Sequence, residues 1–556
     1  MSFFRRSGSV FRFLDIIRRV ILGLVFWIVI AVLIGFLVAA RPPRVKKNSV
    51  LRIMPSGTLT DSSSSPIPYG GLPLGNYPAE TLLDNLVLAI RKGKNDARIQ
   101  GIWLQLDFLH AAGPAVAGEL ADALKNFAES GKPIIASSDS YDNARYRIAS
   151  SADYIITDRL GEVFPVGYGV WRAYLGEGIA KFGGEVNLFR SGESKSAAEN
   201  LIGSEMSETA RKNSRQLLED LWKSWTAAVA ENRHIAQTKL EEWIDNYDKH
   251  LMDAGGNAPL SAQKARLIDA VETGGILEAE LEKRFGEDYA TIEAADYIAR
   301  TGRGKLNADI IAVIPINGVL IYGEGQFGQA GSTDVISALE NVRTAPGIGA
   351  LVLRINSPGG DVRAAEAIRR SVQEISEKWN LPVIASLGNM AASGGYWIAL
   401  EADSIVSRPE TITGSIGVYS VAMNFTSGLA LLGIHYDGLG TTPWTGAGHF
   451  GRRLDERTAL LYESAVKDID AMFRDLTAQK RNLPMEAVNE LAGGIPWSGN
   501  RAYKLKLVDH IGSLDDAVRL AAEQAGLKNW KTIHFTKNQN ARELILNQLL
   551  WGRVRK

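Results

Sequence analysis

Apolar positions along the chain follow two patterns that alternate over most of its length. Short runs such as IQGIWLQLD (residues 99–107) and IGALVLRIN (residues 348–356) predict buried strands, because they are apolar and too short to be helices. Longer amphipathic stretches lie between such runs and predict helices, as in residues 364–379. Strands that alternate with helices favour parallel pairing through helical crossovers, so we predict an α/β fold.

The alternating pattern occurs twice. Residues 132–137 (KPIIAS) match residues 381–386 (LPVIAS), and residues 148–156 match residues 398–406 in the same way. Matched segments lie about 250 residues apart, which is the separation of positions 148 and 398. A repeat of this length predicts two similar domains in tandem.

One segment is too apolar to fit either pattern. Residues 20–40 carry no charge, and as a helix they would span about 31 Å, close to the hydrocarbon thickness of about 30 Å. A cleaved signal peptide usually has a shorter apolar region, so the segment predicts an uncleaved transmembrane anchor. Five basic residues precede it within the chain and five follow it closely, which leaves its orientation open.

The repeat and the anchor divide the chain into five parts: a short N-terminal segment, the anchor, the two copies and a tail. The predicted limits are 1–19, 20–40, 48–300, 301–525 and 526–556. Within the tail, residues 541–556 are amphipathic and end in basic side chains. That pattern fits a helix on a membrane surface and a helix docked on a neighbouring domain or subunit equally well.

Composition excludes several classes of function. The 62 basic residues balance the 62 acidic residues, so no global charge favours nucleic acid as a partner. The chain has no cysteine, which excludes disulfides, thiolate catalysis and cysteine-ligated metals. It also lacks the H-E-x-x-H and G-K-[ST] motifs, so neither a metal nor a cofactor is predicted.

Two short motifs suggest other chemistry but lack the context that it needs. Residues 323–328 fit G-x-G-x-x-G, yet the next helix is predicted only from about Thr333, which favours a flexible loop. Residues 261–264 fit S-x-x-K, but the S-D-N and K-T-G companions are missing and the segment aligns with ordinary helical sequence.

The two copies differ where chemistry would be placed. Ser393 lies among alanines and glycines in NMAASGGY, whereas the aligned residue of the first copy is Asn143, with larger neighbours. Packing alone would favour small residues in both copies, so the difference indicates a nucleophile that a substrate approaches closely. The pattern is not a G-x-S-x-G elbow, because Ala391 replaces the first glycine. The second copy also has the turn NSPGGD (residues 356–361), whose paired glycines can offer backbone N–H groups to an oxyanion.

A serine nucleophile also needs a base. Of seven histidines, only His435 and His449 fall in the strand-rich part of the second copy; neither has an obvious acidic partner, although a Ser-His-Asp triad stays open. A lysine can act instead where burial lowers its pKa. Lys195 lies in the small-residue segment RSGESKSAAE, and its counterpart in the second copy lies near Pro443, without a lysine. The first copy therefore holds a candidate base and the second a candidate nucleophile.

The segments INSPGGDV, AASGGYWIA, TGSIGV and SKSAAE resemble the signal peptide peptidase A (protease IV) family of bacterial membrane-bound Ser-Lys proteases, in its long duplicated form. The resemblance covers essentially the whole chain. It implies two Clp protease/crotonase-like domains of repeated β-β-α units after one N-terminal transmembrane helix. It also implies that Ser393 is the nucleophile, that Lys195 is the general base, and that Ser415 orients the lysine amine.

The same resemblance implies the remaining features of the site and its setting. Gly360 and Gly394 would bind the oxyanion through their backbone N–H groups, and no cofactor would be needed. The protein would be a homotetramer of the bacterial inner membrane, with a cytoplasmic N-terminus and both copies in the periplasm. Its substrates would be signal peptides left in the membrane after cleavage, cut in their apolar stretches.

Two other functions stay open from the sequence. A crotonase-like acyl-CoA enzyme would use the same oxyanion geometry without a Ser-Lys pair, although the anchor disfavours it. A non-catalytic membrane scaffold would use the glycines only for close packing.

Overall fold

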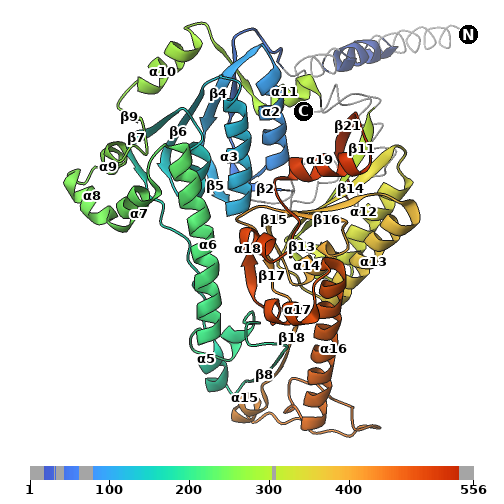
Figure 1. The fold of residues 1–556 in the computed structure, drawn as a ribbon. Helices are drawn as coiled ribbons and strands as arrows, with labels where there is room; N and C mark the ends of the chain where they lie inside the picture. The colour runs from blue at the N-terminus through green and yellow to red at the C-terminus, as the bar shows by residue number, and fades with distance from the viewer. Residues whose placement is uncertain are drawn as a thin grey trace, which may run out of the picture.

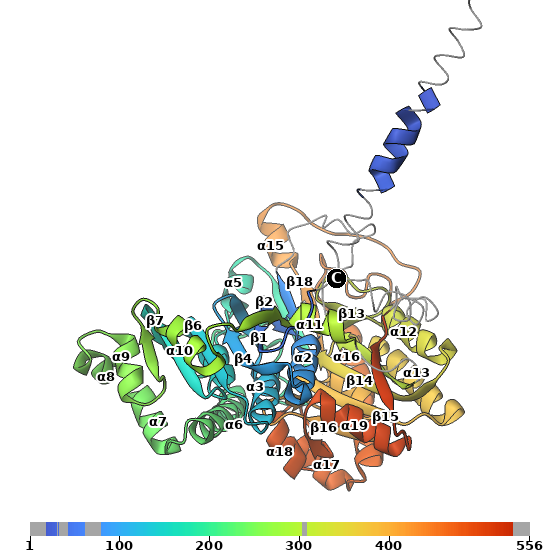
Figure 2. The same cartoon turned by 90° about the horizontal axis from the view of Figure 1, so that it is seen from above.

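The computed structural model describes residues 18–19, 21–30, 32, 43–61, 79–302 and 308–536. Residues 21–30 are helical and stand away from the body of the molecule (Figures 1 and 2). Among the described residues, no helix is long and apolar enough to cross a membrane. The predicted anchor at 20–40 lies partly outside the described residues, and the predicted amphipathic helix at 541–556 lies wholly outside them.

The first copy is built on a six-stranded sheet in which every neighbouring pair is parallel. In spatial order its strands are β10 (Ala290–Glu293), β1 (Ser49–Ile53), β4 (Ile99–Gln105), β6 (Ile134–Tyr141), β7 (Tyr154–Val163) and β9 (Ala270–Glu272). The helices that connect and cover these strands make both faces of the sheet buried, which explains the nearly continuous apolar runs in the sequence.

The second copy repeats this strand order. Its equivalent strands are β21 (Trp530–His534), β11 (Asp309–Asn317), β14 (Ile348–Ser357), β15 (Val383–Ala392), β16 (Ser404–Ser407) and β20 (His510–Ile511). Two further strands, β17 (Ile412–Gly414) and β19 (Pro496–Ser498), extend the sheet beside β15, and only β19 is antiparallel. The predicted α/β fold is thus confirmed, and β21 lies beyond the predicted end of the second copy at residue 525.

Helices connect the strands of both copies. Those of the first copy are α2 (Leu83–Asn95), α3 (Pro114–Ala128), α4 (Asn143–Ala149), α5 (Gly176–Lys181), η1 (Glu199–Leu201), α6 (Glu208–Asn232), α7 (Gln237–Asp245), α8 (Tyr247–Asp253), α9 (Ala258–Lys264), α10 (Ile276–Phe285) and α11 (Ala294–Thr301). Those of the second copy are α12 (Ser332–Thr344), α13 (Val362–Trp379), α14 (Gly394–Ala399), α15 (Thr426–Leu431), α16 (Glu456–Arg481), α17 (Met485–Leu491), α18 (Gly499–Lys504) and α19 (Leu514–Gln524).

Each copy has its own hydrophobic core, and equivalent tyrosines show how closely the two agree. Tyr146 donates its hydroxyl to the carbonyl of Leu267 at 2.6 Å, and Tyr396 donates to the carbonyl of Leu507 at 2.7 Å. The alignment that sets Ser393 against Asn143 uses the same offset of 250 residues, so the repeat predicted from the sequence is present in the structure. The exact domain limits and the Clp/crotonase-like character of each copy stay predictions.

Short strands lie at the carboxyl ends of the main sheets. In the first copy they are β2 (Gly57–Thr60), β3 (Glu80–Leu82) and β5 (Leu109–Ala112), and in the second they are β12 (Val319–Ile321) and β13 (Gln329–Gly331). The G-x-G-x-x-G segment lies between β12 and β13, and α12 begins only at Ser332, so the predicted loop is confirmed. The S-x-x-K segment lies in α9, as ordinary helical sequence.

The two copies are joined by a ribbon and by buried charges. Strand β8 (Glu185–Arg190) of the first copy pairs in antiparallel register with β18 (Tyr419–Asn424) of the second. Figure 1 shows this ribbon near the lower ends of the long helices α6 and α16. Elsewhere, the fully buried Arg354 of the second copy contacts Asp61 and, at 2.9 Å, Glu119 of the first. Removing one partner of such a pair leaves an unpaired buried charge, which typically costs about 3–5 kcal/mol.

Candidate active site

Ser393 lies at a sharp turn between β15 and α14. Its backbone has φ 53° and ψ −120°, a conformation that non-glycine residues rarely adopt and that costs about 1–3 kcal/mol. Two hydrogen bonds hold it: the Ser393 N–H donates to Gly414 O, and its carbonyl accepts from the Trp397 N–H, both at 2.9 Å. This strand–turn–helix arrangement presents the hydroxyl as a nucleophile elbow does, although the sequence lacks the G-x-S-x-G pattern.

The small residues around Ser393 allow α14 to pack against the turn at the end of β14. A Cβ at Gly395 would lie 2.8 Å from the carbonyl oxygen of Ser357, and a Cβ at Gly359 would lie 2.7 Å from the backbone nitrogen of Gly394. Both distances are shorter than real contacts of a Cβ. The crowding of small residues is therefore required by this close approach, which the first copy does not make.

The turn that contains Gly359 and Gly360 is held in place from both sides. Leu320 of β12 donates its N–H to Gly359 O, and its carbonyl accepts from the N–H of Asp361. The Asp361 side chain then caps α13 by accepting from the N–H groups of Arg363 and Ala364. Neither the Gly360 N–H nor the Gly394 N–H appears as a donor in the hydrogen bonds of the described residues, so both are free for a ligand.

Lys195 reaches Ser393 from the first copy. It follows β8 in a tight turn, and the pairing of β8 with β18 continues to Ser191, which exchanges hydrogen bonds with the backbone of Val418. On the far side of the turn, the buried Glu199 accepts from the backbone N–H and the hydroxyl of Ser207, at the start of α6. The turn is thus fixed at both ends.

The Lys195 amine is 3.1 Å from Ser393 Oγ. It also lies 2.8 Å from the carbonyl oxygen and 3.1 Å from Oγ of Ser415, a second residue with positive φ. The structure thus brings together Lys195, Ser393 and Ser415. In the sequence, Lys195 is 198 residues from Ser393 and 220 residues from Ser415.

Burial changes the protonation of this lysine. Lys195 is only 4% exposed, and the loss of water around the ammonium lowers its pKa to about 8. The carboxylate of Asp470 in α16 acts in the opposite direction, but it is itself paired with Arg474 at 2.6 Å. Roughly a tenth of the amine is therefore neutral at pH 7, far more than for an ordinary lysine.

The first copy fills the corresponding place with side chains. The Asn143 amide donates to the Gly167 carbonyl at 2.6 Å, and the Gly167 N–H donates back to it. Arg145 extends from the same helix to the Leu109 carbonyl at 2.7 Å and to the Ser140 hydroxyl. The position that corresponds to Ser393 is thus taken by an amide bonded to the backbone, and the first copy offers no hydroxyl there.

No histidine takes part in the site. All seven lie in the described part of the chain, and none forms a hydrogen bond with Ser393 there. His435 and His449 are exposed, and His449 stacks on Phe450. Pro443 lies in the same exposed segment between α15 and α16. A Ser-His-Asp triad, left open by the sequence, is therefore not formed.

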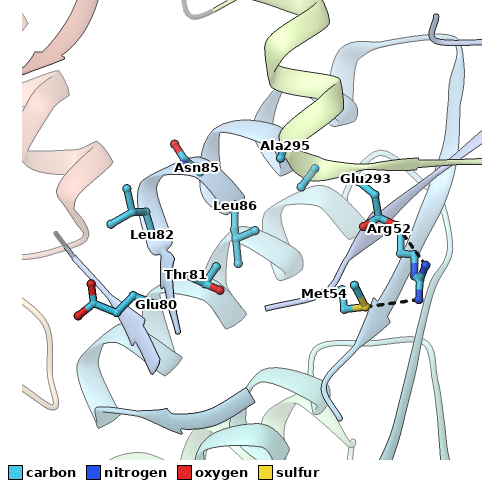
Figure 3. Close-up of a pocket in the computed structure, with 10 residues that line it drawn as sticks. Arg52, Met54, Glu80, Thr81, Leu82, Asn85, Leu86, Glu293 and Ala295 are labelled. Atoms are coloured by element: carbon cyan, nitrogen blue, oxygen red, sulfur yellow. Dashed lines mark hydrogen bonds and ion pairs between the residues drawn. The ribbon is translucent and has the colours of Figure 1, made fainter. Parts of the chain in front are cut away.

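A separate cavity of about 400 Å³ opens in the first copy (Figure 3). Its lining comes from β1, β3, β10 and the first turns of α2 and α11, and Arg52 is paired there with Glu293 at 3.1 Å. None of the five predicted site residues lines it. Among the described residues, no group of His, Asp and Glu side chains could hold a metal ion.

The chain matches the model of peptidase family S49 over residues 126–284 and 376–528. It is 31% identical to Protease 4 of Salmonella typhi over 98% of this chain and 90% of that protein. It is also 31% identical to Protease 4 of Haemophilus influenzae, over 81% of this chain and 74% of that protein. The chloroplastic serine protease SPPA of Arabidopsis thaliana is 28% identical to this chain, over 90% of this chain and 73% of that protein.

The family match and these relatives show that the protein is a serine protease, an enzyme whose nucleophile is a serine hydroxyl. The chain belongs to peptidase family S49, and the resemblance found in the sequence is thereby confirmed. A serine protease is neither a non-catalytic scaffold nor an acyl-CoA enzyme, so both alternatives are set aside.

Two solved structures are similar at a lower level. A mutant ClpP1 from Listeria monocytogenes has a TM-score of 0.24 and 14% identity, covering 38% of this chain and 96% of that chain. A mutant of the 1510-N membrane-bound stomatin-specific protease has a TM-score of 0.27 and 14% identity, covering 41% of this chain and 97% of that chain.

Proposed function

We propose that the protein is a membrane-anchored endopeptidase in which Ser393 is the nucleophile and Lys195 the general base. The observation that carries the proposal is the 3.1 Å contact between Lys195 Nζ and Ser393 Oγ, formed by a buried lysine in a chain that is a serine protease. Its substrates are signal peptides left after cleavage and other apolar peptides, as the resemblance of its motifs implies.

The contacts of Lys195 orient a neutral amine toward the serine. A neutral amine has two N–H groups and one lone pair. The carbonyl oxygen and Oγ of Ser415 accept the two N–H groups, which leaves the lone pair for the third neighbour, the hydroxyl of Ser393. The amine is then ready to accept the hydroxyl proton.

In the proposed reaction, Ser393 Oγ attacks the scissile carbonyl carbon while its proton passes to Lys195 Nζ. The oxyanion accepts hydrogen bonds from the free N–H groups of Gly360 and Gly394. The C–N bond then breaks, and Lys195 gives its proton to the leaving amine. Water attacks the acyl ester, passing a proton to Lys195, and Ser393 departs as an alcohol when that proton returns to it.

The activity is expected to rise with pH, because only the neutral amine is a base. With the pKa of Lys195 at about 8, roughly a tenth of the molecules are active at pH 7, and each lower pH unit removes a further tenfold. Hydrolysis of an apolar peptide, measured as kcat/KM, should rise tenfold per unit and level off above a midpoint near pH 8. A profile that is flat between about pH 6 and 9 would contradict the role of Lys195 as base.

The proposal also includes the setting of the enzyme. Residues 20–40 anchor it in a bacterial inner membrane, with the N-terminus cytoplasmic and both copies periplasmic, as the family resemblance implies. Protease added to spheroplasts should then digest the body of the full chain while a cytoplasmic control protein survives, and the chain should stay with membranes after alkaline washing. Protection of the body, or its release by washing, would contradict this setting.

Exposed apolar side chains support the assembly of several subunits. Phe182, Leu431 and Leu432 are 78%, 79% and 75% exposed, beside the outer end of the β8–β18 ribbon. Apolar clusters of this kind often mark contacts between proteins. They are consistent with the homotetramer that the resemblance implies.

A further inference from the structure

The turn that carries Lys195 rests on a glycine from the other copy. Gly494 lies before β19 with φ 96°, and a Cβ there would lie 2.5 Å from Lys195 Cα and 2.6 Å from Lys195 N. These are backbone atoms, so no side chain can rotate away to make room. Any residue with a Cβ at this position would therefore move the backbone of Lys195.

Gly494 also contacts the residue that holds the lysine amine. The hydroxyl of Ser415 donates to the Gly494 carbonyl at 3.3 Å, and the Gly494 N–H donates to the carbonyl of Ile416 at 2.8 Å. Because the Ser415 hydrogen is directed to Gly494, the lone pairs of Ser415 Oγ are left to accept from Lys195 Nζ at 3.1 Å. The carbonyl of Gly494 thus sets which way the Ser415 hydroxyl faces.

We propose that Gly494 is a positioning residue of the Ser-Lys dyad. Its missing side chain sets the place of the Lys195 backbone, and its carbonyl directs the Ser415 hydroxyl that orients the amine. This inference rests on the proposed role of Lys195 as base and adds the means by which the second copy holds a lysine from the first.

The preceding residue supplies a matched control. Gly493 also has positive φ, 75°, but a Cβ there would have no atom within 4 Å. Gly493→Ala therefore adds the backbone strain of an alanine at positive φ without contact to the lysine turn, whereas Gly494→Ala adds the same kind of strain together with the clash.

The test compares wild type, Gly493→Ala, Gly494→Ala and Lys195→Met in the full chain, using hydrolysis of an apolar peptide at several pH values. A displacement of about 1 Å at a catalytic group can cost on the order of a hundredfold in rate, so Gly494→Ala should lose that much in kcat with little change in KM. Its pH midpoint should also rise, because an amine moved out of its buried place returns toward the ordinary pKa of lysine. Gly493→Ala should stay within about threefold of wild type with an unchanged midpoint.

The outcomes separate this inference from the proposed function. Equal kcat values in the two alanine variants, or a loss in Gly494→Ala without a shift of the midpoint, would overturn the positioning role while leaving the dyad intact. Full activity in Lys195→Met would instead overturn the proposed function. If Gly494→Ala melts well below Gly493→Ala, Gly192→Ala replaces it under the same criteria. Gly192 lies in the turn that carries Lys195, and a Cβ at Gly192 would lie 2.7 Å from Gly493 Cα, so Gly192→Ala would displace the turn from the other side.

Discussion

Replacing Ser393 by alanine is expected to lower kcat for an apolar peptide on the order of ten thousandfold to a millionfold, because the acyl-enzyme can no longer form. Alanine has the same backbone preferences as serine at the unusual φ of 53°, so the strain of the turn is unchanged. The free N–H groups of Gly360 and Gly394 are also kept. The variant should therefore fold and bind the peptide with an unchanged Kd, measured by fluorescence anisotropy.

A second serine provides the control for this prediction. Ser371 lies in α13, where its hydroxyl donates to the carbonyl of Ala367 within the same helix. Ser371→Ala should keep kcat and KM close to the wild-type values. If Ser393→Ala kept more than about a hundredth of the wild-type kcat, the nucleophile would have to be another residue.

Replacing Lys195 by methionine is expected to lower kcat on the order of ten thousandfold or more, because no other base reaches the hydroxyl of Ser393 in the described structure. Methionine fills a similar volume and removes a buried amine that is costly to desolvate. The melting temperature should therefore be equal to or above that of the wild type. Loss of activity with stability kept would assign a catalytic role, whereas a large drop in melting temperature would indicate a structural one.

Comparison of the two copies is what made the site predictable from the sequence. Ser393 differs in kind from Asn143, and Lys195 has no lysine as its counterpart, so both stand out without any knowledge of contacts. Their meeting at 3.1 Å could not be derived in the same way. It depends on the pairing of β8 with β18, two strands in different copies whose pairing the sequence does not specify.

The residues that support the dyad were missed for a related reason. Gly494 lies in the segment LAGGIPWSG, where a glycine pair is usually only a turn, and nothing in the sequence indicates that Lys195 packs on it. The strained backbone of Ser393 was missed because Ala391 does not fit the elbow pattern, although alanine is small enough for the same turn. Such contacts between distant segments follow from the packing of the two copies and leave no local signal.

Strand β21 was missed at the other end of the second copy. Trp530–His534 is short and half-exposed, so it lacks the apolar run that marks the central strands. Its partner β11 is mostly apolar and buried along its middle residues. An edge strand of this kind forms because it pairs with a neighbouring strand, and its own sequence shows little strand pattern.

Covalent labelling of the serine by a fluorophosphonate reports the nucleophile and its base together, and it is therefore the sharpest test of the Ser393–Lys195 dyad. We expect a single adduct on Ser393, located by peptide mapping, with a labelling rate that rises with pH to a plateau above about pH 8. In Lys195→Met the same adduct should form at least a hundredfold more slowly, on the order expected for loss of a general base. An adduct on a different serine, or equal labelling rates in the two proteins, would contradict the Ser393–Lys195 dyad.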